Sequence, residues 1–193
     1  MKLPIYSGFA VTIGMALLLV NVGCSNTGRN TAADRPAGQE AADRNSATVS
    51  AADRDFATKA AQIGLAEVEL GNLAQQKGSS QEVKDFGRKL VEDHSKVNAD
   101  LKDIAAKEGI TIPGETDRKH RDLIDKLSKL SGKEFDREFA KHMVDGHRDA
   151  IDLFRKEAES TMNQSLKTFA SNTLPTLQDH LNMAESINRN LSK

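Results

Sequence analysis

The chain has 193 residues, a net charge of −1 and an aromatic content of 4%. This length suits one ordinary domain, and the near-neutral charge and scarce aromatic side chains give no support to nucleic-acid binding. Because there is a single cysteine, an internal disulfide and a site built from several thiolates are both excluded.

The first 23 residues have the layout of a secretory signal. One cation, Lys2, precedes an apolar run from about Ile5 to Val20, and small residues follow up to Gly23. The run is marginal for a membrane-spanning helix of roughly 20 residues. We therefore predict a signal peptide over residues 1–23, with an uncleaved anchor as an alternative.

The only cysteine, Cys24, comes directly after this stretch. The sequence "NVGC" resembles a bacterial lipobox, although Asn21 stands where that pattern prefers leucine. An ordinary cleaved signal is the alternative to lipidation. The resemblance implies that Cys24 receives a lipid, and Ser25 after it favours sorting to the outer membrane. We expect a protein of the cell envelope, on the periplasmic side, held at the membrane through this lipid anchor.

Residues 24–49 are predicted to form a flexible tether. They are rich in small and polar residues, with almost no large apolar side chain. Such a segment cannot bury enough surface to offset the entropy of ordering it.

Four long amphipathic helices are predicted in residues 50–193. Ser50 is suited to cap the first, and Glu82 is expected to complete a capping box where the second begins, at Ser79 or Ser80. A connection over about residues 110–132 contains a shorter helix. The predicted long helices cover about 51–76, 80–107, 133–159 and 164–190.

The length and spacing of these helices predict the fold class. Each is roughly 40 Å long at about 1.5 Å per residue, and no alternating strand pattern occurs. Two tight hairpins and one long connection indicate an all-α antiparallel four-helix bundle.

Three histidines interrupt the apolar stripes of these helices. His94, His147 and His180 each lie on or beside an inward face near the middle of a helix, and Glu67 lies on the inner face of the first helix. Imidazole is a common ligand of iron, zinc and copper, and bundle cores hold such sites. These four residues are the candidate metal ligands. The alternatives are a structural polar layer, or histidines that never meet.

Motifs that would indicate a reaction are absent from the sequence. There is no Glu-x-x-His pair, no HExxH and no phosphate-binding glycine loop, so we identify no catalytic residue. Pro175 interrupts the last helix one turn before His180. It is interpreted as a simple kink or, alternatively, as a kink that opens room beside His180.

Three stretches carry a resemblance to a known family. "LVEDHSKVNADL", "GKEFDREFAKHMVDGH" and "NTLPTLQDHLNMAE" occur in this order and resemble the bacterial domain-of-unknown-function family 4142. The resemblance implies a ferritin-like bundle over about residues 50–191 in an outer-membrane or periplasmic protein. It implies no reaction.

The sequence therefore favours a lipid-anchored, non-enzymatic envelope protein, with a structural, interaction or stress-related role and a partner in the envelope. The alternative is a metal-binding bundle that uses the three histidines and Glu67 to hold iron, zinc or copper. The oligomeric state is left open.

Overall fold

The computed structural model describes residues 49–193. The predicted signal peptide, Cys24 and all but the last residue of the predicted tether lie outside the described residues. No helix within residues 49–193 combines the length and the apolar character needed to cross a bilayer.

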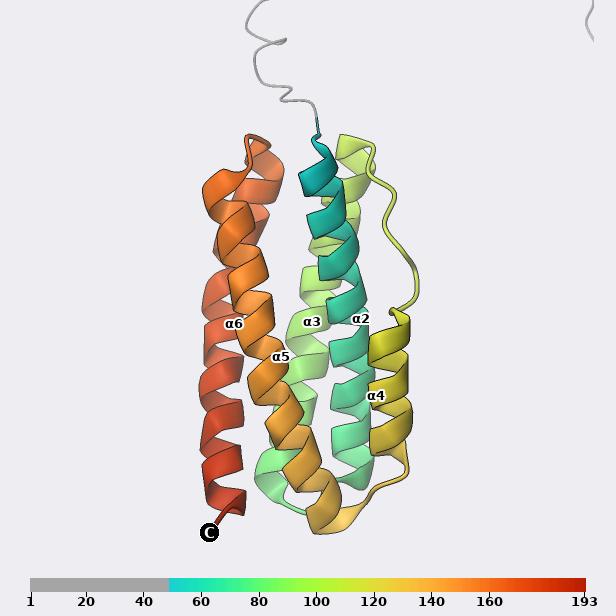
Figure 1. Ribbon diagram of the computed structural model, residues 1–193, viewed down its shortest axis with the longest axis vertical. Coiled ribbons are helices and arrows are strands. Elements are labelled where there is room, and N and C mark those ends of the chain that lie inside the picture. Colours follow the sequence, from blue (N-terminus) through green and yellow to red (C-terminus); the bar gives the residue numbers. More distant parts are fainter. Residues whose placement is uncertain (1–48) are drawn as a thin grey trace, which may run out of the picture.

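Four long helices form an antiparallel bundle (Figure 1). They are α2 (Ala51–Lys77), α3 (Gln81–Glu108), α5 (Gly132–Ser160) and α6 (Gln164–Leu191), and the short α4 (Arg118–Ser128) lies between α3 and α5. The pairs α2–α3 and α5–α6 are hairpins, and the connection from α3 to α5 runs down the bundle beside α2. Across the bundle, α2 packs on α5 and α3 packs on α6. The predicted all-α ferritin-like bundle with one long connection is confirmed, and the helix ranges agree to within one or two residues.

Local signals set several helix ends as expected. Ser50 caps α2, and its capping box with Asp53 is complete: Ser50 Oγ accepts from the Asp53 amide at 3.1 Å, and Asp53 Oδ2 accepts from the Ser50 amide at 2.7 Å. At the same open end of the α2–α3 hairpin, Gly109 ends α3 in the left-handed conformation, with φ 64°.

The start of α3 differs from the prediction. Ser80 is the N-cap and accepts from the Val83 amide at 3.1 Å, so Glu82 does not occupy the position that a capping box uses. Ser79 is held instead by the next hairpin, because its amide donates to the carboxylate of the buried Asp136 in α5 at 2.9 Å. The predicted box with Glu82 is therefore wrong, since a contact from another helix decides where α3 begins.

The helices of the first hairpin approach one another closely. A Cβ atom added at Gly71 would lie 2.6 Å from the carbonyl oxygen of Gly87, and one added at Gly87 would lie 2.6 Å from that of Gly71. Both positions need glycine because the two backbones are in contact there.

The apolar core falls into two clusters along the bundle axis. One cluster, near the start of α2, contains Phe56, Phe154 and Phe169. The other, near the end of α2, contains Phe86, Phe135 and Phe139. On every long helix the break between these clusters is at mid-length.

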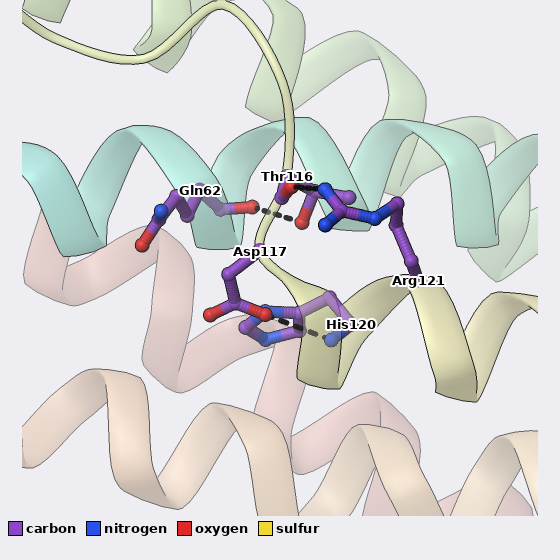
Figure 2. Close-up of polar contacts among 5 residues, drawn as sticks. All are labelled: Gln62, Thr116, Asp117, His120 and Arg121. Carbon is purple, nitrogen blue, oxygen red and sulfur yellow. Dashed lines mark hydrogen bonds and ion pairs between the residues drawn. The ribbon is translucent and has the colours of Figure 1, made fainter.

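The long connection is fastened to α2 by polar contacts (Figure 2). The Thr116 hydroxyl donates to the carbonyl oxygen of Gln62 at 3.0 Å, and Arg121 donates to the Thr116 carbonyl. Asp117 caps α4 by accepting from the His120 amide at 2.8 Å. The Thr116 bond ties the connection to α2, and the other two bonds order the start of α4 beside it.

Candidate functional site

Each long helix contributes one buried polar residue to a layer between the two core clusters. These are Glu67 on α2, His94 on α3, His147 on α5 and His180 on α6, with exposed fractions of 6%, 3%, 1% and 0%. They lie at the mid-length break, where the fully buried apolar side chains of the two clusters stop. The sequence predicted the three histidines near mid-height and Glu67 on the inner face of its helix, and in the structure all four side chains are buried.

The three imidazole rings form a compact group. Ring centroids lie 5.2 Å apart for His94 and His180, 5.3 Å for His147 and His180, and 6.0 Å for His94 and His147. One nitrogen from each ring lies within 4.8 Å of the other two. The structure therefore brings together side chains from three helices that are far apart in the sequence.

Two hydrogen bonds to groups outside this three-histidine group decide which ring nitrogens carry hydrogen. Nδ1 of His147 lies 2.9 Å from the carbonyl oxygen of Met143, and Nε2 of His180 lies 2.8 Å from Oδ2 of Asp93. A carbonyl oxygen and an ionised carboxylate only accept, so each of these nitrogens donates an N–H. In neutral rings, Nε2 of His147 and Nδ1 of His180 then carry no hydrogen.

The two nitrogens without hydrogen face each other across 3.3 Å. Two lone pairs at this distance form no hydrogen bond and repel, unless a cation or an added proton lies between them. Beside them, Nε2 of His94 is buried without a hydrogen-bond partner, which native interiors rarely tolerate. The centre of the group therefore holds two facing acceptor nitrogens, and the third ring has a nitrogen with no hydrogen-bond partner.

Burial keeps the rings of His94 and His180 uncharged. Burial first, and then the neighbouring His147 and His180, lower the pKa of His94 well below its ordinary value. Burial also lowers the pKa of His180 to about 4, although the hydrogen bond to Asp93 opposes this. Partial burial raises the pKa of Asp93, but hydrogen bonds from Lys89 and His180 outweigh it and lower that pKa overall. An ionised Asp93 beside neutral His94 and His180 is thus the state at pH 7.

Glu67 lies near the three-histidine group without being one of its members. Its Oε2 atom is buried and has no hydrogen-bond partner. Burial raises the pKa of this carboxyl group, and the nearby His147 and His120 oppose the rise. Of the four predicted metal ligands, the structure thus groups the three histidines and leaves Glu67 beside them.

Asp93 is the residue that sequence reasoning missed. It precedes His94, and adjacent residues on a helix point in different directions, by about 100° at 3.6 residues per turn. That direction takes its carboxylate to α6, where Oδ2 accepts from His180 and also lies 2.9 Å from Nζ of Lys89. The pairing of α3 with α6 was the missing information.

The chain matches one family of unknown activity. The family described as "Domain of unknown function (DUF4142)" matches residues 38–187. No curated protein matches the chain.

Two solved structures share the fold. A DUF305 fragment from Deinococcus radiodurans is 11% identical, with a TM-score of 0.64, over 74% of this chain and 98% of that one. A structure from Streptomyces coelicolor, described as "putative secreted protein DUF305", is 13% identical, with a TM-score of 0.63, over 76% of this chain and 96% of that one. At these identities the likeness shows the fold alone.

Proposed function

The chain belongs to the DUF4142 family, for which no activity is assigned, and we propose that it is an exported helical-bundle protein that binds one transition-metal ion between His94, His147 and His180. The observation that carries the proposal is the facing pair of nitrogens without hydrogen at 3.3 Å, with the unpaired Nε2 of His94 beside them.

The spacing supports this assignment. Two nitrogens bound to one zinc ion at about 2.0–2.1 Å, at a tetrahedral angle, lie about 3.3–3.4 Å apart. His147 and His180 already have this spacing. The widest separation within the group is at most 4.8 Å, so a contraction of no more than about 1.5 Å would bring all three nitrogens to ligand spacing.

The outer hydrogen bonds support it as well. A metal-bound histidine nearly always donates its other N–H to a carboxylate or a backbone carbonyl, which orients the ring and fixes its tautomer. His180 donates in this way to Asp93, and His147 to the Met143 carbonyl. Neutral imidazole is the form that binds metals, and the lowered pKa values of His94 and His180 keep them in it.

The three nitrogen ligands restrict which metal ions can bind. Three imidazole nitrogens suit zinc, copper or iron(II) and disfavour calcium or magnesium, which prefer oxygen. Three protein ligands leave a fourth position for water or for a further donor. We propose that Glu67, whose buried Oε2 has no hydrogen-bond partner, is the candidate residue to act at this fourth position.

Metal analysis of the full chain, purified without chelators, tests the proposal. We expect about one zinc, copper or iron per chain, and its loss in His94→Ala and His180→Ala. His142→Ala is the matched control, because His142 is a half-buried histidine of α5 outside the three-histidine group. A wild-type chain that stays metal-free after each ion is added would leave the three histidines as a structural polar layer, in a bundle with an interaction or stress-related role.

We further propose export and lipid anchoring at the outer membrane. The signal-like residues 1–23 and the lipobox-like position of Cys24 support this, and the Streptomyces structure of the same fold carries a secreted label. Cys24→Ser should abolish incorporation of labelled lipid and release the protein from washed membranes, whereas Asn26→Ser should leave both unchanged. Retention of label and membrane association by Cys24→Ser would contradict the anchor.

A further inference from the structure

The buried three-histidine group has to be reached from solvent along one of the four seams between neighbouring helices. The α2–α3 seam is tight on both sides of this level: the backbones meet at Gly71 and Gly87 on one side, and on the other a Cβ atom added at Gly64 would lie 1.9 Å from Oδ1 of Asn98. The α5–α6 seam is bridged beside the histidines by Arg148 and Glu185, at 2.6 Å.

The α2–α5 seam is covered by the long connection. Helix α4 packs against both α2 and α5, and its His120 lies near Glu67. Lower down, Lys126 of α4 pairs with Glu138 of α5 at 2.6 Å. The connection therefore closes this side of the bundle (Figure 1).

The α3–α6 seam differs, because a groove of about 840 Å³ follows it from the middle of the bundle to the start of α6. Asp93 lines its mid-bundle end, together with Thr173 and Thr176. Two smaller grooves, of about 370 and 360 Å³, contain neither the three histidines nor Asp93. The large groove thus leads to a residue that is hydrogen-bonded to His180.

The charge of this groove favours a cation. Four carboxylates line it against two ammonium groups: Asp93, Asp100, Asp103 and Glu108, with Lys96 and Lys107. Lys89, which pairs with Asp93, adds a third ammonium group beside the inner end, so an excess of one negative charge remains. A cleft lined by an excess of one sign raises the local concentration of counter-ions and their association rate. A hydrated divalent cation is the occupant that fits this charge and the donors at the inner end.

Helix α6 is also locally weakened where the groove ends. Pro175 lies inside α6 and has no amide hydrogen, so the Ser171 carbonyl loses its partner in the helix. The His180 ring is fully buried, so an ion that passes Asp93 needs the seam to open transiently. This interruption of the helix hydrogen bonds lies about one turn before His180. Bending of α6 at this point would therefore open the α3–α6 seam beside the buried ring.

We propose that the α3–α6 groove is the route by which a hydrated divalent metal ion enters and leaves the three-histidine group, with Asp93 at its inner end. This inference rests on the metal binding proposed above. The route determines the kinetic barrier that the metal ion crosses in both directions. Blocking the route therefore slows uptake and release by the same factor and leaves the dissociation constant unchanged.

The test is the rate of Zn²⁺ uptake by the metal-free full chain, and of its release to an excess of chelator. Thr176→Trp places an indole one turn before His180, where Thr176 lines the groove. We expect both rates to fall about tenfold or more, which corresponds to about 1.4 kcal/mol of barrier. Asn188→Trp is the matched control, because Asn188 lines the smaller α5–α6 groove.

Two further variants keep the test decisive if Thr176→Trp does not fold. Pro175→Ala restores the missing amide and should slow both rates, since α6 then bends less readily. The double variant Asp100→Asn, Asp103→Asn should slow uptake about threefold to tenfold at low salt and reduce its salt dependence.

The outcomes separate this inference from the proposed function. Zn²⁺ binding by wild type with unchanged rates in the folded variants would overturn the route and leave the metal site standing. Lost affinity in Thr176→Trp with an unchanged uptake rate would also overturn the route. No Zn²⁺ binding by wild type would overturn both proposals.

Discussion

The Nε2–H of His180 on α6 donates to Oδ2 of Asp93 on α3 across 2.8 Å. Through this bond, a partly exposed carboxylate decides which nitrogen of a fully buried ring faces the bundle axis. The result is an Asp–His pair whose free nitrogen, Nδ1, points at Nε2 of His147.

Asp93→Asn should weaken metal binding at the three-histidine group by about 10–100-fold, because the outer carboxylate orients the ring and makes it a stronger ligand. Equilibrium Zn²⁺ titration measures the affinity, and ¹⁵N NMR of the His180 ring should show a smaller fraction with hydrogen on Nε2. Asp149→Asn, an exposed carboxylate on α5, is the control. Unchanged affinity together with an unchanged tautomer would contradict this role of Asp93.

His94→Leu should be tolerated or stabilising in the metal-free protein, within about 1 kcal/mol of wild type or above it. Nε2 of His94 has no hydrogen-bond partner to lose, so leucine removes an unpaired buried polar atom. His180→Leu should cost more, since it removes the hydrogen bond that Asp93 accepts from the buried ring and leaves only Lys89 paired with that carboxylate. Urea unfolding compares the two variants, and a loss above about 3 kcal/mol for His94→Leu would instead indicate a required network.

The metal-free protein should lose stability in acid through His180. Its pKa is about 4 in the folded chain, against an ordinary 6.5, so the unfolded chain binds more protons between these values. The contribution is present above pH 6.5 and is lost as the pH falls toward 4. From His180 alone, the free energy of unfolding should be about 2 kcal/mol lower at pH 5 than at pH 7. His180→Gln should show a smaller fall, and an equal fall would contradict this assignment.

Glu157 should have the opposite dependence. Burial first, and then the charge of Asp53 and a hydrogen bond with it, raise the pKa of Glu157 to about 7. The folded chain therefore binds more protons than the unfolded chain between pH 4.5 and 7, and this stabilisation is lost as the pH rises through 7. Glu157→Gln stays uncharged, so its urea midpoint should fall less than that of wild type between pH 5 and 8. Exposed Glu159→Gln is the control, and identical pH profiles for wild type and Glu157→Gln would contradict the prediction.

Asp136→Ala should be strongly destabilising, by about 2–4 kcal/mol, because it leaves backbone amides without an acceptor. The Asp136 carboxylate is fully buried and accepts from the amides of Ser79 and Ser80, each at 2.9 Å. Asp136→Asn keeps one acceptor oxygen and should lose less. Asp152→Ala, at an exposed site on the same helix, is the reference in thermal unfolding. A similar melting temperature for the Asp136 and Asp152 variants would show that this contact does not hold the hairpins together.

Much of the fold was predictable from the sequence, because helix formation and amphipathic spacing are local properties of the chain. His94, His147 and His180 were recognisable as polar residues in apolar stripes, and similar distances from the hairpin turns placed them near one height. The capping box at Glu82 was predicted wrongly because the start of α3 depends on a contact between distant residues. The Ser79 amide donates to Asp136, which lies 57 positions away, and no local sequence pattern reveals this contact.

The sequence by itself determined the helices, the single long connection and the depth of the three histidines, since periodicity and helix rise depend only on neighbours along the chain. The tertiary structure alone decided that Asp93 holds His180, that the Met143 carbonyl orients His147, and that only the groove on the α3–α6 seam, among those described for residues 49–193, leads to this pair. These features depend on how each helix is rotated and shifted against its neighbours. That packing is set by the sum of contacts along the whole bundle and by no segment on its own.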